Sequence, residues 1–145
     1  MKTLADTALD FETSKIYPGI PEYFRADGRG MYHYLTGAAS WYLLTMITEV
    51  FGVRGSAGDL LLYPKLLSDQ FDENGIASLA VTFAGKQLEI VYENKEHKDF
   101  GSYTVVSADC DGKELTIVED SHALISRQRL EALSDGVHRI TVTLK

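Results

Sequence analysis

The sequence predicts an α+β protein in which helices precede an antiparallel β-sandwich or jelly-roll-like domain. Residues 31–48 contain no Asp, Glu, Lys or Arg, and their apolar side chains fall on every side of a helical wheel. After Phe51 the apolar period changes from helical to alternating, and turn signals such as Asp111-Gly112 separate short strands. We therefore expect a helical part over residues 1–52 and a β domain over residues 53–145.

The helical part is expected to hold a short helix around Leu4 to Phe11 and a longer, uncharged helix that begins at Thr36. A helix that is apolar all round is typical of a buried position. Its uncharged length approaches the roughly 20 residues of a membrane span. Polar residues such as His33 and Ser40 argue against that placement. Because the short pattern before it offers few neighbours, we expect its packing partners to lie outside these residues.

The β domain is predicted from alternating apolar residues between turns. Glycines after the uncharged helix, Gly52, Gly55 and Gly58, end it and form a connection. A turn at Ala84–Lys86 joins two alternating strands, and a brief helix at Arg127–Leu133 precedes the last strand. Six short strands are expected, at Leu60–Tyr63, Ala77–Phe83, Leu88–Tyr92, Tyr103–Val105, Leu115–Val118 and Ile140–Leu144. Short strands joined by turns in this way favour an antiparallel sandwich.

The Thr36-Gly37 step, which opens the uncharged helix, is a candidate anion site. The first N–H groups of a helix have no intrahelical partners, and the helix dipole adds partial positive charge there. Thr36 is expected to act as the N-cap, and Gly37 has no side chain to keep a phosphate from those donors. An ordinary capped helix explains the same two residues, and on the residues alone that explanation is the stronger one.

Charge and cysteine content exclude several classes of function. The formal net charge of −7 argues against nucleic acid or an anionic membrane as partner. Cys110 is the single cysteine, which excludes an internal disulfide and makes the cytoplasm the expected location. The charged segment after Met1 differs from a signal peptide. The four histidines have no spacing suited to a metal, so we expect neither a metal site nor a cofactor.

Four motifs follow one another along the chain in a characteristic order. They are SKIYPGIPEYF (Ser14–Phe24), GRGMYHYLTGAASWY (Gly28–Tyr42), EVFGVRGSAGDLLLYPKL (Glu49–Leu66) and FAGK (Phe83–Lys86). Together they resemble the C-terminal part of the cellobiose phosphorylase type of glycoside phosphorylase, glycoside hydrolase family 94. The resemblance weakens beyond Gly112, where strand patterning alone continues. It implies that residues 1–52 are the end of a truncated (α/α)6 catalytic barrel.

The resemblance implies a glycosyltransferase-type enzyme of carbohydrate metabolism. Members of the family split a β-glucosidic disaccharide with inorganic phosphate, invert the anomeric carbon and release α-glucose 1-phosphate. Phosphate takes the place that water has in an inverting hydrolase, so one protein carboxylic acid suffices, to protonate the leaving oxygen. In the family a Thr-Gly pair before the last barrel helix helps to bind that phosphate, and Thr36 and Gly37 match it. With this match, an anion site at Thr36 and Gly37 becomes the stronger explanation, ahead of an ordinary capped helix.

The resemblance also implies which parts of the enzyme lie elsewhere. The family's general acid is an Asp in the middle of the barrel, before the Thr-Gly step, and the Arg and His of its phosphate cluster precede that step too. We therefore assign no catalytic residue and expect these residues alone to be inactive. Possible substrate contacts in the preceding loop are Glu22, Tyr23 and Arg29. Glu22 would repel phosphate unless it points elsewhere, for example toward sugar hydroxyls, and for Arg29 a surface role is the stronger explanation.

Two functions of different classes remain open. In the first, the chain is the carboxyl end of a glycoside phosphorylase and meets phosphate and a β-linked glucosaccharide in the complete enzyme. It then associates with its missing catalytic portion, or with itself, through the uncharged helix. In the second, it is an independent noncatalytic β-sandwich module that binds carbohydrate or protein. An independent module would pack the helix under its own sheet, whereas a fragment would expose it. Because Trp41 lies inside this helix, we expect it to pack in a core rather than to stack on a sugar ring.

Overall fold

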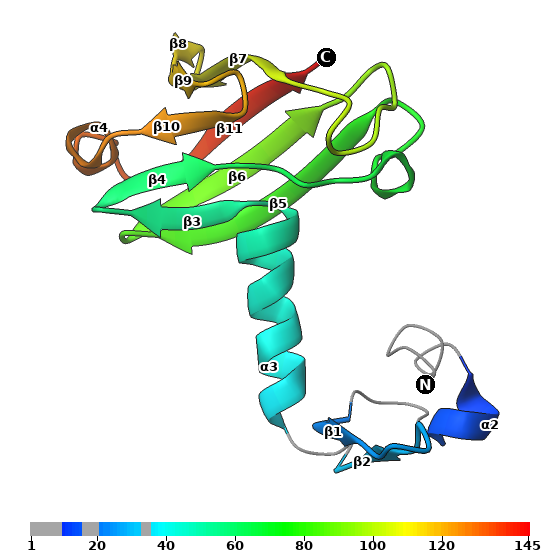
Figure 1. Cartoon of the computed structure of the whole chain (residues 1–145). Coiled ribbons are helices and arrows are strands. Elements are labelled where there is room, and N and C mark those ends of the chain that lie inside the picture. The colour runs from blue at the N-terminus through cyan, green and yellow to red at the C-terminus, as the bar shows by residue number, and fades with distance from the viewer. Residues whose placement is uncertain (1–9, 16–20, 33–35) are drawn as a thin grey trace. The chain divides into compact units, whose positions relative to one another are not determined.

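The chain divides into two compact units, Met1–Thr45 and Met46–Lys145, in the computed structural model (Figure 1). The structure describes residues 10–15, 21–32 and 36–145, without the side chain of Thr36. The sequence places the boundary after residue 52, whereas the two units meet between Thr45 and Met46. Residues 46–51 belong to the second unit because Ile47, Val50 and Phe51 pack against its hydrophobic core.

In the first unit, the described residues form two helices and a small hairpin. The elements are α2 (Phe11–Ser14), β1 (Tyr23–Phe24), β2 (Gly30–Met31) and α3 (Thr36–Thr45). Helix α2 is capped by Asp10, whose carboxylate accepts a hydrogen bond from Thr13 N at 3.2 Å. Strands β1 and β2 pair antiparallel, with Tyr23 opposite Met31. Of the helix expected around Leu4 to Phe11, residues 4–9 lie outside the described part of the chain.

Helix α3 carries the uncharged sequence, and its apolar side chains are exposed. Trp41 is 69 % exposed and Leu43 is 63 % exposed, although they stand at different positions around the helix. The expectation that Trp41 packs in a core is therefore wrong for the described chain. The helix is apolar on all sides, as the sequence indicates. Such a pattern shows that a helix is suited to a buried position, but it does not show which residues would cover it.

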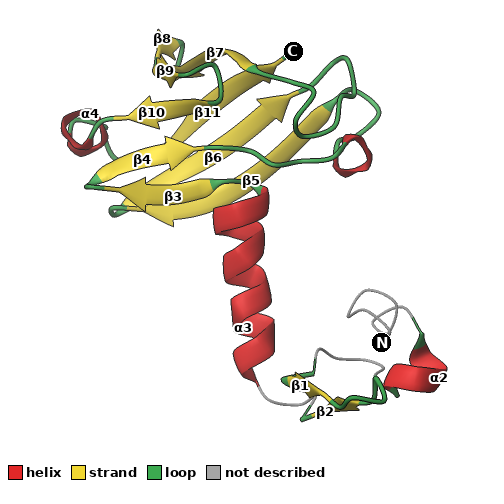
Figure 2. Ribbon diagram, in the orientation of Figure 1, coloured by secondary structure: helices red, strands yellow, loops and turns green. Residues whose placement is uncertain are grey.

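The second unit is built from two β-sheets (Figure 2). The four-stranded sheet has the order β3 (Val53–Ser56), β4 (Asp59–Leu62), β10 (His122–Ile125) and β9 (Thr116–Val118). The five-stranded sheet has the order β5 (Ile76–Phe83), β6 (Lys86–Glu93), β11 (Val137–Leu144), β7 (Val105–Cys110) and β8 (Lys113–Glu114). Three short helical segments accompany them, η1 (Met46–Val50), η2 (Ser68–Gln70) and α4 (Arg127–Glu131). The coarse prediction, a sandwich-like α+β fold, is confirmed.

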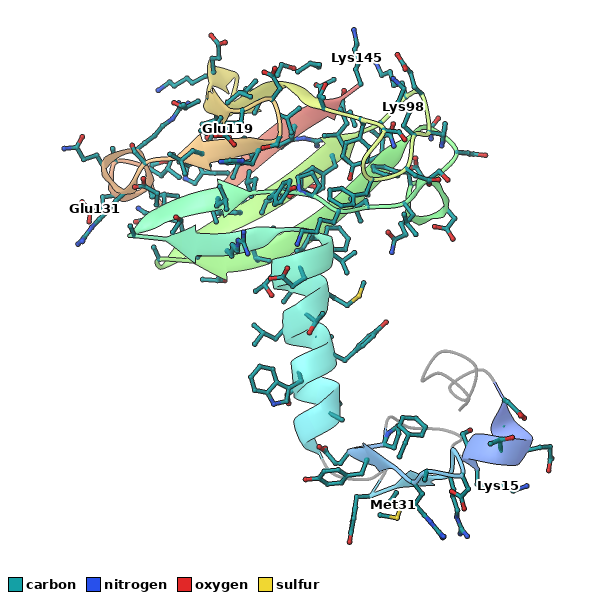
Figure 3. All side chains as sticks on the ribbon, in the orientation of Figure 1. Lys15, Met31, Lys98, Glu119, Glu131 and Lys145 are labelled. Atoms are coloured by element: carbon teal, nitrogen blue, oxygen red, sulfur yellow. The ribbon has the colours of Figure 1, made fainter. Side chains whose placement is uncertain are left out.

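The core of this unit lies between the two sheets, where their side chains fill the space (Figure 3). Alternation produces it, because every second residue of a strand points to the same face. Leu60 and Leu62 of β4 are completely buried, and so are Ile140 and Val142 of β11. Tyr92 of β6 is buried as well, and its hydroxyl donates to Phe51 O at 2.5 Å. The two sheets and the residues after η1 therefore share one core.

Several details differ from the expected sandwich. Strands β6 and β11 pair parallel, with Ile90 beside Ile140, so the prediction of a wholly antiparallel sandwich is wrong at this pair. The strand expected at Leu115–Val118 is present as β9 (Thr116–Val118), but it pairs with β10 in the four-stranded sheet. The strand that pairs with β7 across the Asp111-Gly112 turn is the shorter β8 (Lys113–Glu114). The strands β3 and β10 were not predicted. The sequence of β3, VRGS, falls in the stretch that its glycines indicate as a connection, and the sequence of β10, HALI, does not alternate between polar and apolar residues.

Candidate functional site

The amino end of α3 binds a carboxylate of the same chain. The backbone N–H of Ala38, in the first turn of the helix, donates a hydrogen bond to Glu22 Oε1 at 2.6 Å. Glu22 directly precedes β1, and its own N–H donates to Met31 O at 3.2 Å, which ties it to the hairpin. The first turn of a helix offers unpaired N–H donors and partial positive charge. The structure therefore shows an oxyanion at the end of the helix where the sequence predicts an anion site.

Gly37 allows this close approach. A Cβ atom built on Gly37 would lie 3.0 Å from Glu22 Oε1 and 3.2 Å from Oε2, closer than nearly all real Cβ contacts. The sequence predicts that Gly37 leaves room for an anion, and in the described residues the Glu22 carboxylate occupies that room. Thr36 is the first residue of α3, one position after the N-cap that the sequence predicts for it, and its side chain lies outside the described part. Its hydroxyl contact to phosphate stays a prediction.

The other two predicted contacts, Tyr23 and Arg29, lie on the β1–β2 hairpin and the turn between its strands. Tyr23 is the first residue of β1 and pairs with Met31 of β2. Its ring is 64 % exposed and meets Tyr32 edge-to-face at 5.9 Å between centroids. Arg29 lies at the turn, where Arg25 N donates to Arg29 O at 2.9 Å. The N–H of Arg29 donates to Asp27 Oδ1 at 3.2 Å within the same turn, and its contact to substrate stays a prediction.

The charge at the helix end is therefore supplied by an acidic side chain and balanced by backbone donors. A carboxylate and a phosphate are both oxyanions and accept hydrogen bonds from the same donors. Phosphate can occupy this position only when the Glu22 carboxylate moves aside, because two anions on the same amides repel each other. What the arrangement can do chemically is bind one anion at a time.

The second unit contains a buried histidine that sequence reasoning assigned no role. His138 Nδ1 lies 2.6 Å from Asp111 Oδ2, and its Nε2 lies 3.0 Å from Ser134 O. The hydrogen bond to Ser134 O and the one to Asp111 raise the pKa of His138. The contact with His138 lowers the pKa of Asp111. The two side chains are 27 residues apart, so no local sequence signal could have joined them.

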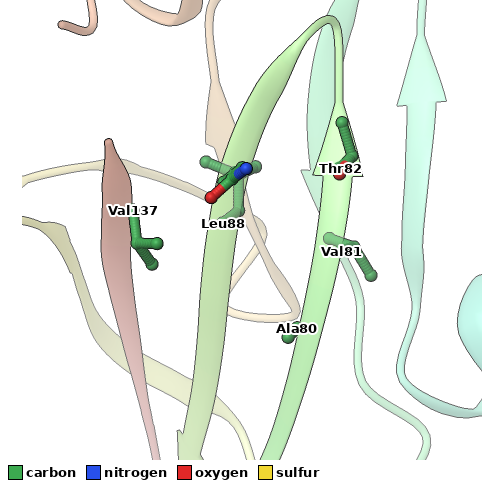
Figure 4. A pocket seen from close by; sticks show the side chains of 6 residues that line it. Ala80, Val81, Thr82, Leu88 and Val137 are labelled. Atoms are coloured by element: carbon green, nitrogen blue, oxygen red, sulfur yellow. The ribbon is translucent and has the colours of Figure 1, made fainter. Parts of the chain in front are cut away.

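The outer face of the five-stranded sheet has a shallow hollow of about 230 Å³ (Figure 4). Its lining residues are Ala80, Val81, Thr82, Gln87, Leu88 and Val137. None of these six side chains is ionisable, and Figure 4 shows small aliphatic groups around most of it. This hollow therefore offers shape but no group for acid–base or nucleophilic chemistry.

The described residues were compared with the requirements of a metal site and of a membrane-spanning helix. Within residues 10–15, 21–32 and 36–145, no group of three or more His, Cys, Asp or Glu side chains is placed to hold a metal ion. In the same ranges, no helix combines the length and the apolar character that crossing a bilayer requires. Cys110 is buried and free, and burial is the main cause that raises the pKa of its thiol.

Comparison with known proteins leaves the family open. No family model matches the chain, and no curated protein matches it. The resemblance to the cellobiose phosphorylase type therefore depends on the four motifs between Ser14 and Lys86, and it stays a prediction.

Proposed function

We propose that the chain is the C-terminal part of an inverting glycoside phosphorylase and supplies part of its phosphate site. One observation carries the proposal, the hydrogen bond from Ala38 N to the Glu22 carboxylate. It supports an anion site because the donor in the first turn of α3 is already bound to an oxyanion. Gly37 supports it too, because it leaves room for that oxyanion. The motifs add the identity of the anion, inorganic phosphate, and the reaction.

In the proposed reaction, phosphate takes the place of the Glu22 carboxylate at the end of α3. A phosphate oxygen then attacks the anomeric carbon of a β-glucosidic disaccharide from the side opposite the leaving oxygen. The bond to the leaving sugar breaks, and a carboxylic acid of the barrel protonates its oxygen. The product is α-glucose 1-phosphate. The displaced Glu22 carboxylate, which only accepts hydrogen bonds, would then be available to sugar hydroxyls.

The exposed apolar surface of α3 fits the same proposal. Trp41 and Leu43 are more than half exposed in the described chain. In a barrel of paired helices, the last helix is covered by its neighbours, so apolar residues on every side would become buried. We propose that α3 is the last helix of an (α/α)6 barrel whose other helices, with the general acid, lie outside these residues. The buried, free Cys110 fits a reducing compartment, and we propose the cytoplasm.

Anion binding at α3 is testable by NMR on the full chain. Inorganic phosphate is added at constant ionic strength, and the amide resonances of Gly37, Ala38 and Ala39 are followed. We expect these resonances to move, and to move also with α-glucose 1-phosphate. In Glu22→Gln the competing charge is gone, so we expect phosphate to bind roughly tenfold more tightly, which corresponds to about 1.4 kcal/mol.

The matched control is Glu12→Gln, which removes the same charge from α2, where Glu12 is paired with Lys15 at 2.7 Å. This variant should bind phosphate like the unmodified chain. Equal phosphate affinity in all three chains, or α3 amides that do not respond, would contradict the proposed phosphate site.

A noncatalytic carbohydrate- or protein-binding module is the second candidate. One observation favours it, namely that Met46–Lys145 is a compact unit with its own hydrophobic core. The same titration separates the two, because a module of this kind needs no phosphate response at α3.

A further inference from the structure

A second hollow lies at one end of the sandwich, within the unit Met46–Lys145. Its volume is about 400 Å³, inside the range of roughly 300–1,000 Å³ that small-molecule sites occupy. The lining residues are Gly58, Phe83, Ala84, Arg127, Leu130 and Glu131. They come from the β3–β4 turn, the β5–β6 turn and α4, which Figure 1 shows gathered at this end. We call it the Phe83 hollow.

The apolar part of the Phe83 hollow is the side chain of Phe83, which lies next to two glycines of the β3–β4 hairpin. Phe83 is the last residue of β5 and is half-buried, and Leu130 is the buried residue of α4. A Cβ atom on Gly55 of β3 would lie 3.5 Å from the Phe83 ring, and one on Gly58 would lie 3.3 Å from Arg127 Cδ. Because both positions are glycine, the hairpin adds no Cβ atom at these two points, and the part of the Phe83 side chain that does not pack against the core lines the hollow.

The polar part of the hollow is a fixed pair of opposite charges. Arg127 Nε donates to Glu131 Oε1 at 2.7 Å, one helical turn apart on α4. The side chains are 72 % and 61 % exposed, and Figure 3 shows Glu131 projecting outward at this end of the sandwich. The backbone N–H of Arg127 donates to Asp59 Oδ1 at 2.8 Å, which ties α4 to β4. This hydrogen bond fixes the start of α4, which carries the pair, against β4 beside the Phe83 side chain.

These features select one class of ligand. A guanidinium only donates hydrogen bonds and a carboxylate only accepts them, so together they match hydroxyl groups, which do both. The pair carries no net charge, which disfavours a free anion or cation. The Phe83 ring offers an apolar face for C–H groups. We propose that the Phe83 hollow binds a neutral carbohydrate, with one sugar ring against Phe83 and its hydroxyls on Arg127 and Glu131.

The carbohydrate site and the proposed phosphate site lie on different elements and are independent of each other. The hollow is formed entirely by residues 58–131, whereas the phosphate response is expected at residues 37–39 of α3. The FAGK motif, to which the proposed reaction gives no role, supplies Phe83 and Ala84 to this surface. A loss of one response with retention of the other therefore distinguishes the two proposals.

The test is an NMR titration of the full chain with cellobiose at millimolar concentrations. We expect shift changes at the amides of Gly58, Ala84 and residues 127–131. Arg127→Ala and Glu131→Ala should each weaken binding about tenfold by removing one side of the hydroxyl contacts. Gly55→Leu should abolish binding, because the added side chain would cover the Phe83 ring. Retained melting temperatures show that the variants fold.

The matched controls are Arg139→Ala and Glu89→Ala. They remove an exposed ion pair of 3.6 Å between β11 and β6, outside the hollow, and should bind cellobiose unchanged. Phenol is the comparison probe, since it fits an apolar hollow without needing hydroxyl contacts. The proposal is overturned if cellobiose shifts no amide of the hollow, if phenol alone binds there, or if the control variants weaken binding as much as Arg127→Ala.

Discussion

At the scale of single residues, the protonation of His138 is set by its two neighbours. Both ring nitrogens face oxygen acceptors, Asp111 Oδ2 at 2.6 Å and Ser134 O at 3.0 Å. A neutral imidazole has one N–H, whereas the imidazolium has two, so only the charged ring satisfies both contacts. Lys86, which donates to Leu133 O nearby, opposes the charge and lowers the pKa of His138 without cancelling the upward shift. The charged ring ties β11 to the β7–β8 turn and to the loop after α4.

We expect a pH-dependent free energy of unfolding from this pair. Because the pKa of His138 is raised in the folded chain, its contribution is complete below the unfolded value of about 6.5 and is lost as pH rises through the folded pKa. The pKa of Asp111 is lowered, so its contribution is present above about 3.8 and is lost as pH falls through its folded pKa. Stability should therefore decline on both sides of this window.

Urea unfolding at a series of pH values measures this effect. His138→Gln should flatten the decline that sets in as pH rises above about 6.5. His97→Gln, at an exposed histidine, should leave it unchanged. The interpretation fails if His138→Gln and the unmodified chain have parallel stability curves across this range.

At the scale of elements, two glycines with similar backbone angles have different surroundings. Gly52, between η1 and β3, has φ +68°, and a Cβ there would lie 1.7 Å from Tyr63 O. Gly85, in the β5–β6 turn, has φ +77°, and a Cβ there would meet nothing within 4 Å. Both conformations favour glycine, but only Gly52 is also enclosed by a neighbouring strand end.

Alanine at the two positions separates backbone strain from steric exclusion. Gly85→Ala should cost about 1 kcal/mol of unfolding free energy, the strain of a positive φ with a side chain. Gly52→Ala should cost more than about 3 kcal/mol, because the backbone of Tyr63 must also move. Urea denaturation of both variants measures the difference. Equal costs would mean that the approach of Gly52 to Tyr63 O is easily relaxed.

The elements also show how far sequence reasoning reached. The hairpin of β5 and β6 was predicted because alternation and the Ala84-Gly85 turn are both local signals. The parallel pairing of β6 with β11 was not, since alternation encodes which face is buried and not which strand lies alongside. At the candidate site, the open approach at Gly37 was predictable from its missing side chain. The contact from Glu22 to Ala38, 16 residues apart, was not, because its geometry depends on how the hairpin ends.

At the scale of the whole molecule, the hydrophobic core of the second unit includes contacts from η1 and from the residue after it. This core extends from Val53 to Leu144, and Ile47, Val50 and Phe51 pack against it. Backbone hydrogen bonds of 2.9 Å join Lys65 N to Val50 O and Tyr63 N to Gly52 O. Residues 46–52 therefore contribute to the sandwich, although the change from a helical to an alternating apolar period after Phe51 predicts that they belong to the helical part.

Two truncations test where the sandwich unit begins. The segment 46–145 should unfold with the same free energy as the full chain, within about 0.5 kcal/mol, because no residue of its core is removed. The segment 53–145 should be less stable by at least about 3 kcal/mol. It lacks the side chains of Ile47, Val50 and Phe51, and it leaves the Tyr92 hydroxyl without its acceptor at Phe51 O. Urea unfolding followed by circular dichroism measures both. If 53–145 is as stable as 46–145, the sandwich begins at residue 53, the boundary that the change of period indicates, and η1 contributes nothing to its stability.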